Sequence, residues 1–277
     1  MRRLIRHILF LMVTYCAFFY FYPLAVNAAG AYTVVSQCKK SQYDGEVTYY
    51  KHDESGAMVV YIKTGDSEKA FTIGFRTPTL DDTGVNHILE HSLLNGATNA
   101  PSKPFTWLIN HTGATYLNEM TFHDFTVYVL ASRDESEYRK LMATYLDRIF
   151  YPKATADEGI FRQEGWRPDA GGYNGTVYNE MKGVYSTDDA YMLRAVYASL
   201  FPDGAYRYDS GGLPDMIPTL TFDRFKEVYE QNYRPGNALI VLYGRQNIDA
   251  ALEMLDKSYL SPKSAGVHDK TVREHKP

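Results

Sequence analysis

The chain has few cysteines and no excess of basic residues, and each shortage excludes a class of protein. Only two of its 277 residues are cysteines, Cys16 and Cys38. A disulfide framework is therefore excluded, and the fold must be held together by burial of apolar side chains. The 29 lysines and arginines against 33 aspartates and glutamates give a net charge of −4, so nucleic acid is not an expected partner.

Signs of disorder, of internal repeats and of several membrane spans are also lacking. Hydrophobic residues make up 45% of the chain and charged residues 22%, and the mean hydropathy is −0.35, as in a packed soluble protein. No repeat or low-complexity tract follows residue 30. The aromatic content of 14% is assigned mainly to packing rather than to apolar peptide grooves.

One long uncharged run, Ile8 to Val26, follows three arginines at the N-terminus. Small residues at Val26-Asn27-Ala28 complete the pattern of a secretory signal over residues 1–28, cleaved after Ala28. The alternative is an uncleaved anchor, because the run of 19 residues is as long as the roughly 18 apolar residues that span a bilayer. We therefore expect an exported protein, secreted, periplasmic or in the cell envelope, with membrane contact only if the signal is retained.

Beyond residue 30 the hydrophobic pattern alternates between the periods of strands and helices, which predicts an α+β fold. A mixed, mostly antiparallel sheet should carry helices packed on one face. The predicted strands form two pairs and a single late strand: 57–63 with 69–75, 114–120 with 125–132, and 238–243. The predicted helices cover 85–94, 135–150, 177–185, 190–200, 221–231 and 248–259. We expect one domain over residues 29–260, and a polar linker or truncated end over residues 261–277.

The most informative motif is His87-Ile88-Leu89-Glu90-His91. On a helix, residues four apart leave the same face one turn apart, so both imidazoles can bind one zinc ion. Glu90 lies on nearly the same face, where its carboxylate can act as a general base without being a ligand. The alternative is a surface helix with two solvated histidines. Apolar neighbours favour a buried helix instead: Ile88, Leu89, Leu93 and Leu94.

A catalytic zinc ion normally takes three protein ligands, so a third ligand must come from elsewhere in the chain. Glu180 is the attractive choice because apolar residues surround it in a short helical pattern, where a charge is costly unless it is compensated. An ion pair with Lys182 or Arg194 would compensate the charge equally well. The residues alone leave both interpretations open.

The chain resembles the inverzincin metallopeptidases, the group of pitrilysin and insulin-degrading enzyme, which share the order His-x-x-Glu-His. Within that group it is similar to the presequence protease and falcilysin branch, from about residue 35 to 260. The matching segments are 84–92, 116–121 with Asp124, Thr126 and Tyr128, then 177–186, 210–214 and 233–237. The resemblance implies that His87, His91 and Glu180 bind zinc and that Glu90 is the base. It also implies that Asn118 binds the backbone of a peptide that adds to the sheet edge as a strand.

Members of that branch have four homologous domains in two halves that close around a peptide, and this chain corresponds to the first domain. The resemblance therefore implies two kinds of partner: a peptide substrate, and a complementary half-enzyme chain or missing C-terminal domains. The second half normally supplies an arginine and a tyrosine that bind substrate and stabilise the oxyanion. Glu119 also departs from the pattern, because many relatives have alanine there.

These observations predict a zinc metalloendopeptidase that hydrolyses unstructured peptides and needs a second half for full activity. The alternative is a non-catalytic fragment or subunit that binds peptides or a partner domain. The complete His87-x-x-Glu90-His91 motif favours the enzyme.

Overall fold

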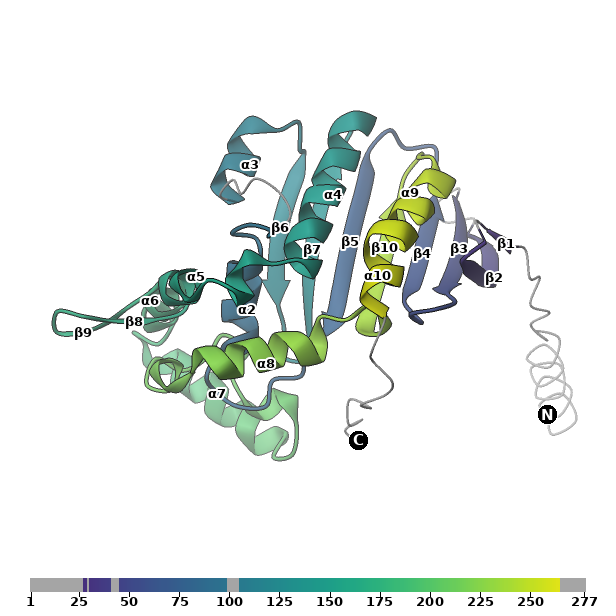
Figure 1. Cartoon of the computed structure of the whole chain (residues 1–277). Helices are drawn as coiled ribbons and strands as arrows, with labels where there is room; N and C mark the ends of the chain where they lie inside the picture. The colour runs from purple at the N-terminus through teal and green to yellow at the C-terminus, as the bar shows by residue number, and fades with distance from the viewer. Residues whose placement is uncertain (1–26, 29, 41–44, 99–104, 265–277) are drawn as a thin grey trace, which may run out of the picture.

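The computed structural model describes residues 27–28, 30–40, 45–98 and 105–264. Nearly all of the predicted signal and most of the predicted linker lie outside these residues. The chain folds around one eight-stranded sheet with the order β1-β2-β3-β4-β10-β5-β7-β6 (Figure 1). Neighbouring strands are antiparallel except β4 and β10, which are parallel. The predicted α+β fold with a mixed, mostly antiparallel sheet is confirmed.

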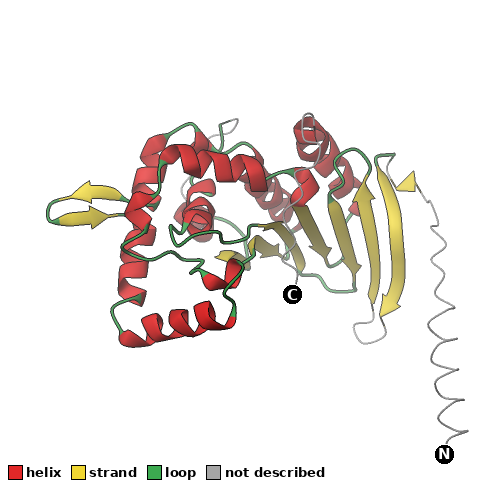
Figure 2. Ribbon diagram, turned by 90° about the horizontal axis from the view of Figure 1, so that it is seen from below, coloured by secondary structure: helices red, strands yellow, loops and turns green. Residues whose placement is uncertain are grey.

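The strands of the sheet are β1 (Asn27–Ala28), β2 (Tyr32–Lys40), β3 (Gly45–His52), β4 (Met58–Lys63), β5 (Lys69–Arg76), β6 (Tyr116–Thr121), β7 (Phe125–Ser132) and β10 (Ala238–Tyr243). A separate hairpin, β8 (Arg167–Asp169) with β9 (Gly172–Asn174), extends away from the body of the molecule (Figure 2). The α-helices are α2 (Val85–Leu93), α3 (Phe105–His111), α4 (Glu135–Phe150), α5 (Glu158–Glu164), α6 (Thr176–Val184), α7 (Asp188–Leu200), α8 (Phe222–Asn232), α9 (Ile248–Leu255) and α10 (Ser261–Ser264).

The predicted pairing of β4 with β5 is wrong, because β10 lies between them and pairs with both. Its sequence, Ala-Leu-Ile-Val-Leu-Tyr, carries no charge and suits the centre of a sheet. The second predicted pair, β6 with β7, is present. Strands β2 and β3 were missed, although the Thr, Val and Tyr content of β3 is typical of a strand.

Helices α4, α9 and α10 cover one face of the sheet (Figure 1). Beneath them the core is made of large buried side chains, among them Phe71, Ile73, Phe75, Tyr145 and Phe150. Positions on the opposite face are more open, and Leu239 in the central strand is 49% exposed. The prediction of helices on one face is therefore confirmed.

The described chain ends in a short helix. Ser261–Ser264 form α10, at the start of the region predicted as a polar linker. The turn before it is anchored because Tyr259 and Leu260 are buried. The Asp256 carboxylate also accepts a hydrogen bond from the Ser261 hydroxyl and faces the buried His52. Among the described residues, we find no helix with the length and apolarity needed to cross a bilayer.

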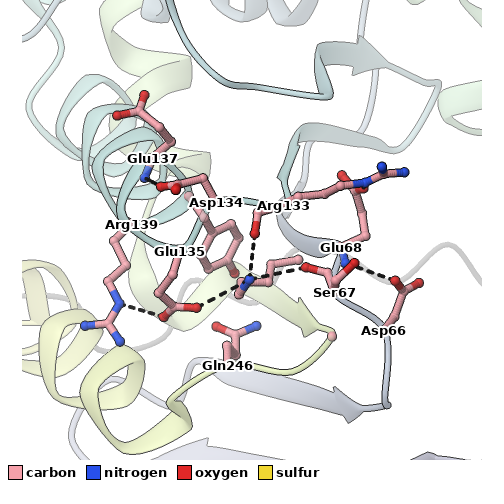
Figure 3. A network of polar contacts seen from close by, with 12 residues as sticks. Asp66, Ser67, Glu68, Arg133, Asp134, Glu135, Glu137, Arg139 and Gln246 are labelled. Carbon is pink, nitrogen blue, oxygen red and sulfur yellow. Dashed lines mark hydrogen bonds and ion pairs between the residues drawn. The ribbon is translucent and has the colours of Figure 1, made fainter.

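A polar network ties the start of β5 to the turn between β7 and α4 (Figure 3). The Lys69 ammonium donates to the Ser67 and Arg133 carbonyl oxygens and lies 3.5 Å from Glu135. Asp134 caps α4 by accepting from the Glu137 backbone N–H at 2.8 Å. This network holds the far end of the sheet, away from the motif on α2.

Candidate metal site

Helix α2, which carries the motif, is held by close packing at its N-terminal end and along its buried face. Gly84 precedes the helix with a φ of 67°, and a Cβ there would lie 2.5 Å from the Gly211 carbonyl oxygen. The Asn86 side chain donates to the Thr77 carbonyl at 2.8 Å. The buried residues of α2 include Val85, Ile88, Leu89 and Leu93. The predicted helix is therefore present and buried.

The structure brings His87, His91 and Glu180 together, with one possible ligand atom from each lying within 4.8 Å of the others. Nε2 of His87 is 3.8 Å from Oε2 of Glu180, and Nε2 of His91 is 3.7 Å from the same oxygen. Ligand atoms around a tetrahedral zinc ion at about 2.0–2.1 Å lie roughly 3.3–3.4 Å apart. Two imidazole nitrogens and one carboxylate oxygen are ligands that zinc takes, and the three side chains must move closer together to bind the ion.

Glu180 is more exposed to solvent than the sequence predicted. Its side chain is 50% exposed, whereas the sequence predicted a buried carboxylate. Helix α6 buries only Val177 and Met181, so the residues next to them in sequence remain open to solvent. The alternative partner Arg194 pairs instead with Asp82 at 2.5 Å.

The two imidazoles have different electrostatic surroundings. Burial lowers the pKa of His87, and the neighbouring His91 lowers it further. Burial also acts to lower the pKa of His91, but the carboxylates of Glu164, Glu90 and Glu180 outweigh it, so the pKa of His91 is raised. Both rings point Nε2 toward Glu180. On the other side, Nδ1 of His87 is 3.4 Å from the Gly211 carbonyl oxygen.

Glu90 is 4% exposed and is not one of the three clustered residues. Burial raises the pKa of the Glu90 carboxyl, while a hydrogen bond with Thr121 and the charge of His91 act in the opposite direction. A carboxyl with a raised pKa holds a proton more readily near neutral pH, which is the property required of a general base.

Asn118 and Glu119 lie on β6, which is the last strand of the sheet in its described part. Alternation along the strand puts Glu119 and Thr121 on the helix-covered face, opposite buried Tyr128 and Thr126. Asn118 lies on the opposite face and donates to the Tyr116 hydroxyl at 3.0 Å. The side chain of Asn118 is therefore directed away from the face that carries Glu90.

Glu164 was not identified from the sequence. It ends α5, is 7% exposed, and its Oε2 lies 3.8 Å from Nδ1 of His91. Burial acts to raise its pKa, but the facing His91 imidazole and hydrogen-bond donors from Thr176 and Gln163 lower it below the usual range. Its neighbour Trp166 fixes this segment by donating to the Leu220 carbonyl at 2.9 Å.

Comparison with known proteins relates this chain and its fold to the pitrilysin-type, or M16, peptidases. No family model matches the chain. Protein HypA of Clostridium perfringens is 41% identical over 234 residues, which cover 82% of this chain and 24% of that protein. Presequence protease 1 of Arabidopsis thaliana is 41% identical over 217 residues, which cover 76% of this chain and 20% of that protein. The chain is therefore homologous to M16 peptidases over most of its length, but spans only a fifth to a quarter of these relatives.

Solved structures agree on the fold. The crystal structure of pitrilysin matches with a TM-score of 0.63 at 15% identity, over 83% of this chain and 24% of that one. An inactive M16 peptidase domain from Pseudomonas fluorescens matches with a TM-score of 0.58 at 15% identity, over 75% of this chain and 48% of that one. Because the fold occurs with and without activity, the fold alone does not establish catalysis.

Proposed function

We propose that the chain is the catalytic domain of a zinc metalloendopeptidase that hydrolyses unstructured peptides. The observation that carries the proposal is the meeting of His87, His91 and Glu180 from α2 and α6, with the buried carboxylate of Glu90 on the same helix as the histidines. Bound there, a zinc ion supplies Lewis-acid chemistry, since it lowers the pKa of water and polarises a carbonyl group.

Glu90 supplies the proton transfer in this proposal. Its carboxylate takes a proton from the attacking water and returns it to the leaving amine of the peptide. The apolar packing around α2 keeps bulk water from the helix side of the carboxylate. The raised pKa of Glu90 supports this role, because it brings the affinity of the carboxylate for the proton closer to the working pH.

Peptide binding is assigned to the outer edge of β6. An edge strand offers unpaired backbone N–H and C=O groups to an added strand, and Asn118 adds a side-chain amide on this strand. The M16 relatives are four to five times longer than the matched region, which supports the need for a complementary half or further domains. Export through residues 1–28 belongs to the same proposal.

A second candidate is a non-catalytic subunit that binds peptides or a partner domain. The half-exposed Glu180 favours it, because a site open to water gives weaker electrostatic stabilisation than a closed one. The fold match to an inactive M16 domain is compatible with it.

Metal analysis combined with two variants tests both candidates. The purified chain should hold one zinc ion, and His87→Ala should lose it. Glu90→Gln should keep the zinc and lower the hydrolysis rate of an unstructured peptide at least about a hundredfold. The assay is run with and without the remaining domains of a relative. Absence of zinc from the unmodified chain, or loss of zinc in Glu90→Gln, contradicts the assignment; zinc without hydrolysis in either assay favours the binding subunit.

A further inference from the structure

The inference rests on the proposed zinc site and concerns how His91 is held. Glu164 approaches His91 from the side opposite Glu180. Its first oxygen, Oε1, accepts hydrogen bonds from the side-chain amides of Asn95 at 3.0 Å and Gln163 at 2.9 Å. Its second oxygen, Oε2, faces Nδ1 of His91 at 3.8 Å. The two oxygens of the carboxylate therefore have separate partners.

Asn95 connects this carboxylate to the helix that carries the histidine. Its amide donates to the His91 backbone carbonyl at 2.9 Å as well as to Glu164. The same side chain thus fixes the backbone of His91 and the carboxylate that faces its ring. A buried carboxylate is costly unless its oxygens are compensated, and the side chain of Glu164 is only 9% exposed. Its position beside His91 therefore requires the amides that hold it.

We propose that Glu164 and Asn95 are positioning residues for His91. Glu164 accepts the Nδ1–H of the imidazole, which leaves the Nε2 lone pair free to bind a metal ion. Asn95 holds the Glu164 carboxylate in the position that this contact requires. A neutral imidazole carries a single N–H, so a carboxylate at Nδ1 selects the tautomer that can ligate through Nε2. At His87 the group that faces Nδ1 is a neutral backbone carbonyl, which is a weaker acceptor than a carboxylate. The two ligands are therefore supported unequally.

A purely structural role is the alternative, because the contact between Asn95 and Glu164 also joins α2 to α5. Metal affinity and folding stability separate the two roles. The probes are Zn²⁺ in competition with a chromophoric chelator, the visible spectrum of bound Co²⁺, and thermal unfolding of the metal-free chain. The variants are Glu164→Gln and Asn95→Ala, and the matched control is Glu158→Gln, at the exposed start of the same helix.

We expect Glu164→Gln to weaken zinc binding about 10- to 100-fold and to change the Co²⁺ spectrum. Glu158→Gln should match the unmodified chain. Asn95→Ala should weaken zinc binding less, because Gln163 still donates to Oε1 of Glu164. In the Glu164→Gln background, Asn95→Ala should cause little further loss of zinc affinity, since both residues act through His91. Unchanged zinc affinity in Glu164→Gln, with or without a loss of stability, overturns the proposal.

A measurement on the unmodified chain covers the case in which Glu164→Gln does not fold. Proton NMR of the zinc-loaded chain should contain a downfield, slowly exchanging resonance from Nδ1–H of His91, because a carboxylate shields that proton from water. Its absence overturns the proposal without any variant. Two outcomes separate the zinc site from the role of Glu164. A chain that takes up no zinc overturns both the proposed function and this inference. Normal zinc uptake that does not depend on Glu164 overturns this inference alone.

Discussion

Glu119 gives the sharpest test of the electrostatics around the site. Its carboxyl lies on the helix-covered face of β6, and its Oε2 is buried without a hydrogen-bond partner among the described residues. Burial, and then the negative charge of Glu90, raise its pKa from 4.5 to about 8. We expect Glu119→Gln to stabilise the metal-free chain at alkaline pH, because the amide keeps the shape and removes the charge.

The magnitude follows from proton linkage. The folded chain binds the proton of Glu119 more tightly than the unfolded chain, so the destabilisation is absent below about pH 4.5 and grows as the pH rises toward about 8. Each tenfold change in proton concentration within that window is worth about 1.4 kcal/mol, which gives a total of a few kcal/mol. For a chain of this size the corresponding shift in Tm is roughly 5–10 °C.

The assay is thermal unfolding in the presence of a chelator at pH 4.5 and pH 8.5, so that only the charges of the protein act. The difference in Tm between Glu119→Gln and the unmodified chain should be small at pH 4.5 and several degrees at pH 8.5. Glu230→Gln, at an exposed position of α8, serves as the control and should show no such pH dependence. A Tm difference for Glu119→Gln that stays constant across this range would refute the reasoning.

Three further predictions concern the scaffold. Gly84→Ala should lower the free energy of unfolding, measured in urea, by at least about 2 kcal/mol. The alanine would have to adopt a φ of 67° and would place its Cβ 2.5 Å from the Gly211 carbonyl oxygen, so near-native stability would contradict this packing. Arg194→Met should lower the free energy of unfolding by at most about 1 kcal/mol, since the ion pair of Arg194 with Asp82 is partly exposed. The same variant should be cleaved faster by chymotrypsin within α7, and unchanged cleavage would show that the pair does not anchor this helix. Tyr32→Phe should lower stability by about 1–2 kcal/mol in urea, as its hydroxyl donates to a buried carbonyl of α9 at 3.0 Å, and no loss would argue against that bond.

The sequence could predict features that depend on local periodicity and not those set by packing between distant segments. Helix α2 and its two histidines follow from residues at helical spacing. Glu180 was found near them, although its exposure was predicted wrongly because apolar neighbours in sequence are not neighbours in space. Glu164 was missed because its contact with Asn95 spans 69 residues and depends on how α5 packs on α2. No local pattern encodes that contact.

The central position of β10 has a consequence for folding. The strand completes the middle of the sheet, yet it follows its neighbour β5 by about 160 residues, as the bond from Asn237 to the Arg76 carbonyl illustrates with a separation of 161. Until β10 is synthesised, β2-β3-β4 and β5-β7-β6 can form only as two separate sheets, each with an open hydrogen-bonding edge. At about 5–20 residues per second these edges stay open for roughly 8–30 seconds on the ribosome. The nascent chain is therefore most prone to aggregation during this interval, and joining the two half-sheets is a late step that no early segment can replace.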